Sequence, residues 1–311
     1  MALRYIYAFV LLLTAQLCPA ATDTMTGVFD EHIKSLQVRL DGNDFAAPIV
    51  VMGTPDRIRI DFDHLAEDRE YFRYSLQHCD SRWQPSGLVD SEFLDGFNEG
   101  VIENFDYSRA TAVHYVHYSL TIPNEEVAPM ISGNYLLTVY RESDPSEPVL
   151  QCRFMVSEQT APVTAFATTR TDVDYNKAHQ QLEICVDAER AEVEDIYNDM
   201  RVVVQQNGRL DNERALSRPL RTSGRKAYFE HSPELIFEGG NEYRRFETVS
   251  EFYPGMNVES IDFLHPYRHF YLYVDEPRAD QTYLYDQTQH GRFFVRRQGV
   301  SDHDTEADYG V

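Results

Sequence analysis

The stretch from Tyr71 to Tyr140 constrains the fold most, because apolar and aromatic runs with strand-like spacing alternate in it with turn residues. The runs cover residues 71–78, 113–122 and 134–140. Aromatic and β-branched side chains suit the pleated, half-buried surface of a sheet, and Gly, Pro and Asn favour tight turns. The stretch therefore predicts several β-strands joined by turns.

The residues before this stretch show the same period of two. Between residues 57 and 63, Ile58, Ile60 and Phe62 alternate with charged side chains, which indicates a strand with one buried face. Residues 33–40 repeat this pattern, and short strands are expected at 49–52 and 149–156. Turn signals at these intervals are typical of a two-sheet sandwich. We therefore predict an immunoglobulin- or fibronectin III-like N-terminal β-sandwich over residues 26–157.

Residues 80–112 form a connection that is long for a compact domain, and such connections are usually functional or packed on their own side chains. Six apolar residues predict that it packs and covers an edge of the sheet: Phe93, Leu94, Phe97, Ile102, Phe105 and Tyr107. This connection is the segment that we expect to contact a partner. Trp83, the only tryptophan, is expected in the sandwich core. The alternative is that Trp83, Tyr71 and Tyr74 form a platform on which a sugar stacks.

The second half follows the same rules, so residues 162–311 are expected to form a second β-domain after a linker at 157–162. An acidic loop or helical turn is expected at 188–199. The candidate strands are 163–169, 179–187, 200–206, 226–230, 243–249, 258–264, 269–275, 282–286 and 292–297. The predicted fold class is therefore all-β, with tandem β-sandwich domains.

The N-terminus has the pattern of a secretory signal peptide. Arg4 precedes an apolar segment from Ile6 to Leu13, and small residues follow near Ala20. The apolar segment is shorter than the roughly 20 residues that span a bilayer. We expect export and removal of residues 1–20, with lipidation at Cys18 as the rival interpretation.

The formal net charge of -23 excludes classes of partner that need a basic surface. Nucleic acid and anionic lipid both bind through Lys and Arg, so neither is expected, and no segment after the signal suits insertion into a membrane. The acidic charge serves either solubility or docking onto a basic surface.

Three cysteines remain after the expected cleavage: Cys79, Cys152 and Cys185. Cys152 shares the apolar face of its strand, whereas Cys79 lies on the opposite face from Phe72, Tyr74 and Leu76. This argues against a Cys79–Cys152 disulfide, and free buried thiols are expected.

No catalytic or metal-binding motif stands out. A strained nucleophile turn, a glycine-rich phosphate loop and a helical His pair are all missing from the sequence. His114 and His117 lie in a predicted strand and so point to opposite faces. The exposed acids, such as Asp90 or Glu238, are interpreted as solvated turn residues rather than a glycosidase pair. We predict a non-enzymatic protein without metal, cofactor or small-molecule substrate.

The order and spacing of many short motifs resemble type IX secretion system plug proteins. His78-Cys79-Asp80 begins this series, and Phe237-Glu238-Gly239-Gly240-Asn241-Glu242-Tyr243-Arg244-Arg245-Phe246 belongs to its second half. The resemblance implies a structural role for the following motif residues: His78, Cys79, Trp83, Ser86, Gly96, Ser108, Thr111, His117, Tyr118, Pro123, Asn124, Ser132, Gly133, Asn134, Tyr135, Asn207, Gly239, Gly240, Asn241, Glu242, Arg244 and Phe246.

The resemblance also implies a function. Such a protein lies in the periplasm at the inner side of the outer membrane, where it closes the periplasmic opening of the large outer-membrane translocon β-barrel of that system. The family usually continues past the position of Val311 with more strands, which implies that this chain is a fragment, a truncated product or a shortened member of the family. The alternative from the residues alone is a periplasmic or surface carbohydrate-binding β-sandwich protein.

Overall fold

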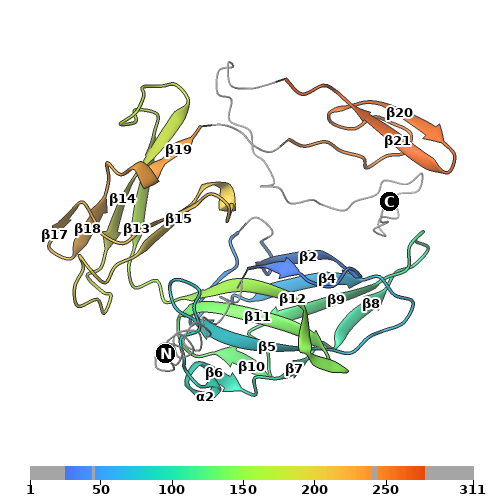
Figure 1. Ribbon diagram of the computed structural model, residues 1–311, viewed down its shortest axis with the longest axis horizontal. Helices are drawn as coiled ribbons and strands as arrows, with labels where there is room; N and C mark the ends of the chain where they lie inside the picture. Colours follow the sequence, from blue (N-terminus) through green and yellow to red (C-terminus); the bar gives the residue numbers. More distant parts are fainter. Residues whose placement is uncertain (1–24, 44–45, 240–243, 277–311) are drawn as a thin grey trace, which may run out of the picture.

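The computed structural model describes residues 25–43, 46–239 and 244–276, and its regular structure is almost entirely β-strand (Figure 1). The one α-helix in this part of the chain is α2 (Asp90–Phe93). The prediction of an all-β chain with tandem β-sandwiches is confirmed. No helix within the described ranges is long and apolar enough to cross a membrane. The expected signal peptide lies outside the described residues.

The N-terminal sandwich consists of two facing sheets (Figure 1). The larger sheet has the order β1-β12-β11-β5-β7, with β3 parallel to β12, and the smaller has the order β2-β4-β9-β8. Their bounds are β1 Gly27–Val28, β2 Ile33–Leu40, β3 Ile49–Val51, β4 Ile58–His64, β5 Phe72–Cys79, β7 Gly100–Val101, β8 Asn104–Tyr107, β9 Val116–Ile122, β11 Gly133–Arg141 and β12 Asp144–Ser157. The strand expected at 113–122 thus begins three residues later, at Val116.

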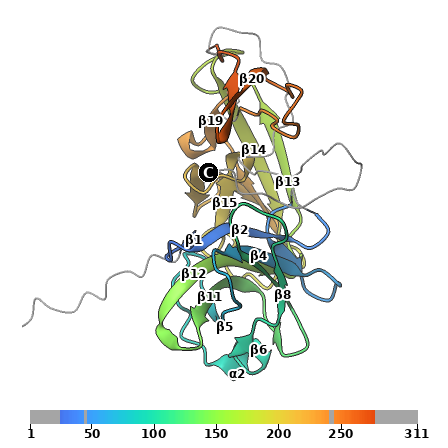
Figure 2. The ribbon, with the colours of Figure 1, turned by 90° about the vertical axis from the view of Figure 1, so that its right-hand side faces the viewer.

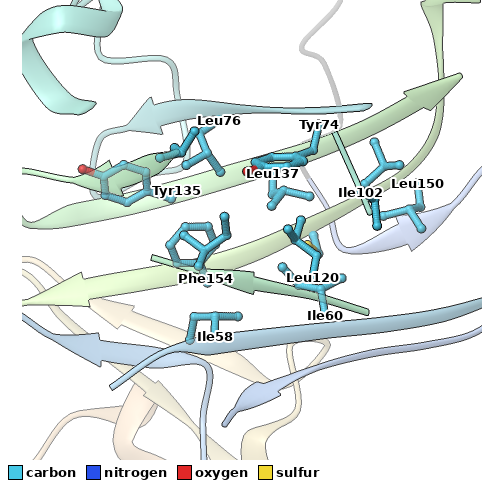
Figure 3. Close-up of a cluster of buried hydrophobic side chains, with 14 of the residues drawn as sticks. Ile58, Ile60, Tyr74, Leu76, Ile102, Leu120, Tyr135, Leu137, Leu150 and Phe154 are labelled. Carbon is cyan, nitrogen blue, oxygen red and sulfur yellow. The ribbon is translucent and has the colours of Figure 1, made fainter. Parts of the chain in front are cut away.

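The core lies between the two sheets, where the inward-facing side chains of alternate residues meet (Figure 3). Ile58 and Ile60 of β4 face Tyr135 and Leu137 of β11 and Phe154 of β12 across this space, and all five are fully buried. Each such side chain contributes roughly 1.5–3 kcal/mol on burial. The period of two in the sequence therefore places the core correctly.

The connection at 80–112 contains structure of its own. β7 extends the larger sheet beside β5, and β8 extends the smaller sheet beside β9. The segment therefore supplies an edge strand to both sheets, whereas one covered edge was expected. Phe93, Leu94 and Ile102 are buried, but Phe97 and Tyr107 are exposed, so the packing predicted for these two side chains is wrong. Phe97 is exposed because the backbone on either side of it is held, at Gly96 and at Asn98.

The loop after β5 corrects the prediction for Trp83. Its backbone folds back on the strand, because Asp80 N–H donates to Gln84 O at 2.7 Å and Ser86 N–H donates to His78 O at 3.0 Å. Trp83 has a left-handed φ of 62° and is only half-buried, with the Arg153 guanidinium 4.2 Å from its ring centroid. It is therefore not a core residue.

Cysteine positions agree in part with the sequence analysis. Cys79, Cys152 and Cys185 are all free. Cys79 lies on the face of β5 opposite to the core-facing side chains, yet it is only 1% exposed. Its backbone pairs with that of Pro85 in an isolated β-bridge, so the returning loop lies against it. Burial raises the pKa of both the Cys79 and the Cys152 thiols, that of Cys152 to about 12.

The second half forms three further sheets (Figures 1 and 2). One has the order β13-β14-β18-β17 with β19 also beside β14, and β15 pairs with β16 and β20 with β21. A small core contains Ile184, Val186 and Phe229. The bounds are β13 Val163–Thr168, β14 His179–Asp187, β15 Val202–Gln205, β16 Glu213–Leu216, β17 Arg221–Ser223, β18 Lys226–Phe229, β19 Ile236–Glu238, β20 Val258–Leu264 and β21 Tyr267–Leu272.

Parts of the second half differ from what its sequence predicts. Residues 188–199 form an irregular loop with turns, whereas residues 244–249 form no strand, so the strand predicted at 243–249 is wrong for those residues. The strands expected at 282–286 and 292–297 lie outside the described residues. Within the described ranges, strands up to Ser157 pair only with each other, and so do those from Val163 onward. The limits 26–157 and 162–311 remain our proposed domain boundaries.

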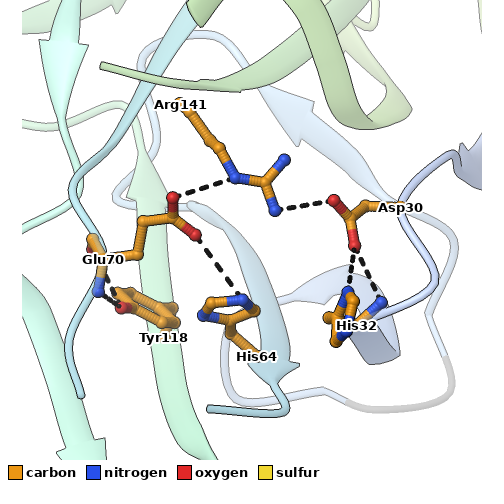
Figure 4. A network of polar contacts seen from close by, with 6 residues as sticks. All are labelled: Asp30, His32, His64, Glu70, Tyr118 and Arg141. Atoms are coloured by element: carbon orange, nitrogen blue, oxygen red, sulfur yellow. Dashed lines mark hydrogen bonds and ion pairs between the residues drawn. The ribbon is translucent and has the colours of Figure 1, made fainter. Parts of the chain in front are cut away.

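A polar network joins the β1–β2 and β4–β5 connections to strands β4, β9 and β11 of the N-terminal sandwich (Figure 4). Arg141 donates to Glu70 Oε1 at 2.9 Å and to Asp30 Oδ2 at 2.6 Å. The Tyr118 hydroxyl accepts from Glu70 N–H and donates to Glu70 O, both at 2.9 Å. His64 lies 3.5 Å from Glu70, and burial lowers its pKa. The network fixes the β4–β5 connection against both sheets.

Replacing Tyr118 with phenylalanine tests this network. The substitution leaves the N–H and C=O of Glu70 without their partner, so we expect a loss of about 1–3 kcal/mol of unfolding free energy. Urea unfolding followed by Trp83 fluorescence measures it. Tyr107→Phe is the matched control, because Tyr107 is half-exposed. An equal loss in both variants would contradict the role of the hydroxyl.

Candidate functional site

The outer face of the smaller sheet carries a cluster of paired charges. Asp61 and Asp63 of β4 point away from the core but are only 3% and 6% exposed. His117 of β9 places Nδ1 2.7 Å from Asp63 Oδ1 and Nε2 3.6 Å from Asp61 Oδ1. Arg39 Nη2 lies 2.6 Å and Arg59 Nε 3.0 Å from Asp61 Oδ2. Each acid is thus covered by cationic partners.

The shifted pKa values of this cluster keep its ion pairs charged at neutral pH. Hydrogen bonds to Asp61 and Asp63 raise the pKa of His117 to about 9, so the ring is protonated at neutral pH. Burial alone would raise the pKa of Asp61, but hydrogen bonds from His117, Ser119 and Arg59 outweigh it and lower the value to about 2. At neutral pH His117 therefore holds its proton and Asp61 stays ionised, which suits a structural role.

His114 is separate from this cluster. It precedes β9 and lies 2.5 Å from Glu67, so the structure does not bring it together with His117. Within the described ranges, no group of three or more His, Cys, Asp and Glu side chains has an arrangement that holds a metal ion.

Several of the motif residues gather instead around a small projection at the end of the N-terminal sandwich. We define the lobe as residues 86–99 and 124–131. It contains α2 and a two-stranded ribbon of β6 (Leu94–Gly96) and β10 (Val127–Pro129). Figures 1 and 2 both show it at the bottom of the molecule, at the end away from the second half.

Asn124 anchors one side of the lobe. Its side-chain oxygen accepts from Glu126 N–H at 3.0 Å and Val127 N–H at 2.9 Å, and its amide nitrogen donates to the Tyr74 hydroxyl at 2.8 Å. It follows Pro123, whose peptide bond with Ile122 is cis. Asn124 therefore links the start of β10 to the core of the sandwich.

His78 and the hairpin start anchor the other side. The His78 ring lies 5.8 Å from the Phe93 ring and 5.1 Å from the Tyr135 ring, and its Nε2 is 3.2 Å from Ser132 O. A Cβ on Gly133 would come within 2.2 Å of that nitrogen, so the close approach requires glycine. Asn134 donates to Asp80 O at 2.8 Å.

The segment between Gly96 and Asn98 is held at both ends. Gly96 has a φ of 106°, and a Cβ there would lie 1.8 Å from Glu126 O. Asn98 accepts from Leu76 N–H at 2.7 Å and donates to Leu76 O at 2.8 Å, which imitates the pairing of a strand with β5. Phe97 lies between these two fixed points and is 88% exposed.

The surface of the lobe combines apolar and acidic side chains. Leu88, Val89 and Met130 are exposed in addition to Phe97. The lobe contains six acidic residues and no Lys or Arg: Asp90, Glu92, Asp95, Glu99, Glu125 and Glu126. All six are exposed; Glu92 accepts from Val89 N–H at the start of α2, and Glu99 lies 3.5 Å from Arg73. The lobe is our candidate partner-binding site.

The remaining motif residues have local structural roles or lie elsewhere. Ser108 accepts from Tyr115 N–H, Thr111 donates to Val113 O, and Ser86 accepts from Leu88 N–H. In the second half, Asn207 has a left-handed φ of 57° in a turn, and Gly239 N–H donates to Ala178 O. Arg244 pairs with Asp275, and Phe246 is exposed. Gly240, Asn241 and Glu242 lie outside the described residues.

The proposed sugar platform does not form. Tyr74 is buried with its hydroxyl bonded to Asn124, whereas Tyr71 packs against Arg69 at 4.5 Å and Trp83 against Arg153. The three rings do not share a surface. The exposed Phe97 was missed as a surface residue because its apolar character alone indicates packing.

Comparisons with known proteins place these features in context. The family model of the type 9 secretion system plug protein 1st domain matches residues 33–158. A crystal structure of a hypothetical protein from Parabacteroides merdae ATCC 43184 is 35% identical, with a TM-score of 0.84 over 91% of this chain and 72% of that chain.

A second solved structure is much less similar. The Pseudomonas fluorescens alkylpurine DNA glycosylase AlkC, bound to DNA containing an abasic site analog, is 10% identical with a TM-score of 0.21, over 40% of this chain and 30% of that chain. So low a similarity says nothing about the fold or function of this chain. No curated protein matches the chain.

Proposed function

Because this chain belongs to the type IX secretion system plug protein family, we propose that it closes the periplasmic opening of that system's large outer-membrane translocon. The chain is a plug-type component of type IX secretion, and it associates with an outer-membrane component of that system. The translocon barrel is the partner that we propose, at the periplasmic side of the outer membrane.

The observation that carries the proposal is the family match over residues 33–158, which contain most of the N-terminal sandwich and the whole lobe. A wide translocon leaks solutes when it is idle unless something blocks it. A sandwich whose connections are fixed by part-buried ion pairs and by hydrogen bonds between side chains and backbone provides a rigid blocking body. We propose that it acts by steric obstruction, without catalysis.

The plug must also leave when cargo passes. Release requires a transient interface, and transient interfaces are smaller and more polar than obligate ones. The net charge of -23 is suited to such a polar interface, provided that the partner surface is basic.

Deleting the gene tests the proposal. We expect the outer membrane of the deletion strain to admit large solutes, measured by uptake of a bulky antibiotic or fluorescent dextran, while type IX secretion continues. Complementation with the wild-type chain should restore the barrier. A double deletion that also lacks the translocon is the control and should remain impermeable. An intact barrier in the single deletion, with the translocon present, contradicts the plug function.

A further inference from the structure

Phe97 is presented by a rigid backbone rather than by a loose loop. Gly96 approaches the carbonyl of Glu126 too closely for any side chain, and Asn98 bonds both backbone groups of Leu76. A water-exposed phenylalanine gains nothing from this geometry in the isolated chain. A residue whose backbone is already fixed loses little backbone entropy on binding. The position of Phe97 is therefore suited to an interface anchor.

The neighbourhood of Phe97 resembles the composition of a protein interface. Large apolar side chains dominate the energetic centre of interfaces, and polar groups form the rim. In the lobe, Leu88, Val89, Phe97 and Met130 are exposed, while acidic side chains lie beside them on the same elements. Asp95 precedes Gly96 in β6, and Glu125 and Glu126 precede the opposing strand β10.

The charge of the lobe is of one sign, which limits the partner. It has six acids and no base, and within the described part of the chain only Glu99 of these six forms an ion pair. Charge complementarity therefore requires Lys or Arg on the partner, around a pocket or groove that accepts the aromatic ring.

We propose that the lobe is the docking surface of this chain, and that it binds a basic surface of the translocon with Phe97 inserted into an apolar pocket. This inference rests on the proposed function and identifies the contact surface that the function requires. The position of the lobe at the end away from the second half leaves that surface accessible (Figures 1 and 2).

The test measures binding of the purified full chain to the detergent-solubilised translocon barrel of the same system, immobilised on a sensor. Phe97→Ser should weaken binding by about 30-fold or more, as expected for loss of an anchor. Phe29→Ser is the matched control, because Phe29 is also more than half exposed but lies before β2, outside the lobe. It should bind within about twofold of wild type, as expected for a residue outside the interface.

A second pair of variants tests the charge. Asp95→Lys with Glu125→Lys should slow association by about tenfold at low salt, and the difference should shrink at high salt because ions screen exposed charges. Asp41→Lys with Asp68→Lys changes the net charge equally at exposed sites outside the lobe, and should have a much smaller effect. All variants should keep the wild-type unfolding temperature.

The outcomes separate this inference from the function on which it rests. If the wild-type chain binds the barrel and Phe97→Ser binds equally well, the docking surface is elsewhere and the plug function stands. If the two charge variants associate at the same rate, the proposal of a basic partner surface is wrong. If the wild-type chain does not bind the barrel, the proposed function fails, and this inference fails with it.

Discussion

Replacing Gly96 with alanine should lower the unfolding free energy of the N-terminal sandwich by about 2–4 kcal/mol. Two costs add at this position. The φ of 106° is strained for any L-residue, and the new Cβ would lie 1.8 Å from the carbonyl oxygen of Glu126. The partner atom belongs to the backbone, so it cannot move aside cheaply, and the β6–β10 ribbon must separate.

Gly87→Ala provides the matched control for this prediction. Gly87 also has a positive φ, of 77°, but a Cβ at this position would have no heavy atom within 4 Å. It should therefore show only the conformational cost, about 1 kcal/mol. Urea unfolding followed by the fluorescence of Trp83, the only tryptophan, reports on this part of the chain. Equal losses of unfolding free energy in both variants would show that the close contact with Glu126 does not contribute to the cost of the substitution.

Replacing Asp61 with asparagine should cost about 1.5–3 kcal/mol of unfolding free energy, because it removes the buried carboxylate that three partly exposed cations contact. The change removes the carboxylate that Arg39 and Arg59 contact, whereas His117 keeps its contact with Asp63. Asp106→Asn is the control: Asp106 is opposite His117 in the register of β8 and β9, but it is exposed. Its loss should stay below about 0.5 kcal/mol.

The same variant should change how stability depends on pH. The folded pKa of His117, about 9, is above its ordinary 6.5, so its contribution is full below pH 6.5 and is lost as the pH rises through 9. The folded pKa of Asp61, about 2, is below its ordinary 3.8, so its contribution is full above pH 3.8 and is lost as the pH falls through 2.

Unfolding midpoints between pH 6.5 and 9 measure this dependence. The wild-type chain should lose stability steadily over this range, whereas Asp61→Asn should lose less, because its His117 pKa moves toward the ordinary value. A His117 titration by NMR supplies the pKa directly. An unchanged His117 pKa in the variant would contradict a contribution of Asp61 to the raised value.

The charge cluster also shows where sequence reasoning stops. Alternation in β4 correctly separates Ile58, Ile60 and Phe62 from the charged residues between them, because the side-chain period of a strand is two. It does not reveal that Asp61 and Asp63 on the outer face are buried. That depends on β2 and β9, whose cationic side chains lie beside them only after the sheet has formed.

Most strands of the N-terminal sandwich, its alternating core positions and the family follow from the sequence alone, because each rests on local spacing or on motifs in order along the chain. Asp30, Glu70 and Arg141 are up to 111 residues apart in the sequence and meet only in the folded sandwich. No local sequence pattern predicts that contact. Trp83 and Phe97 are both aromatic, and their composition favoured burial for each. The tertiary structure decided otherwise, because left-handed or clamped backbone at those positions directs the rings onto an arginine or into solvent.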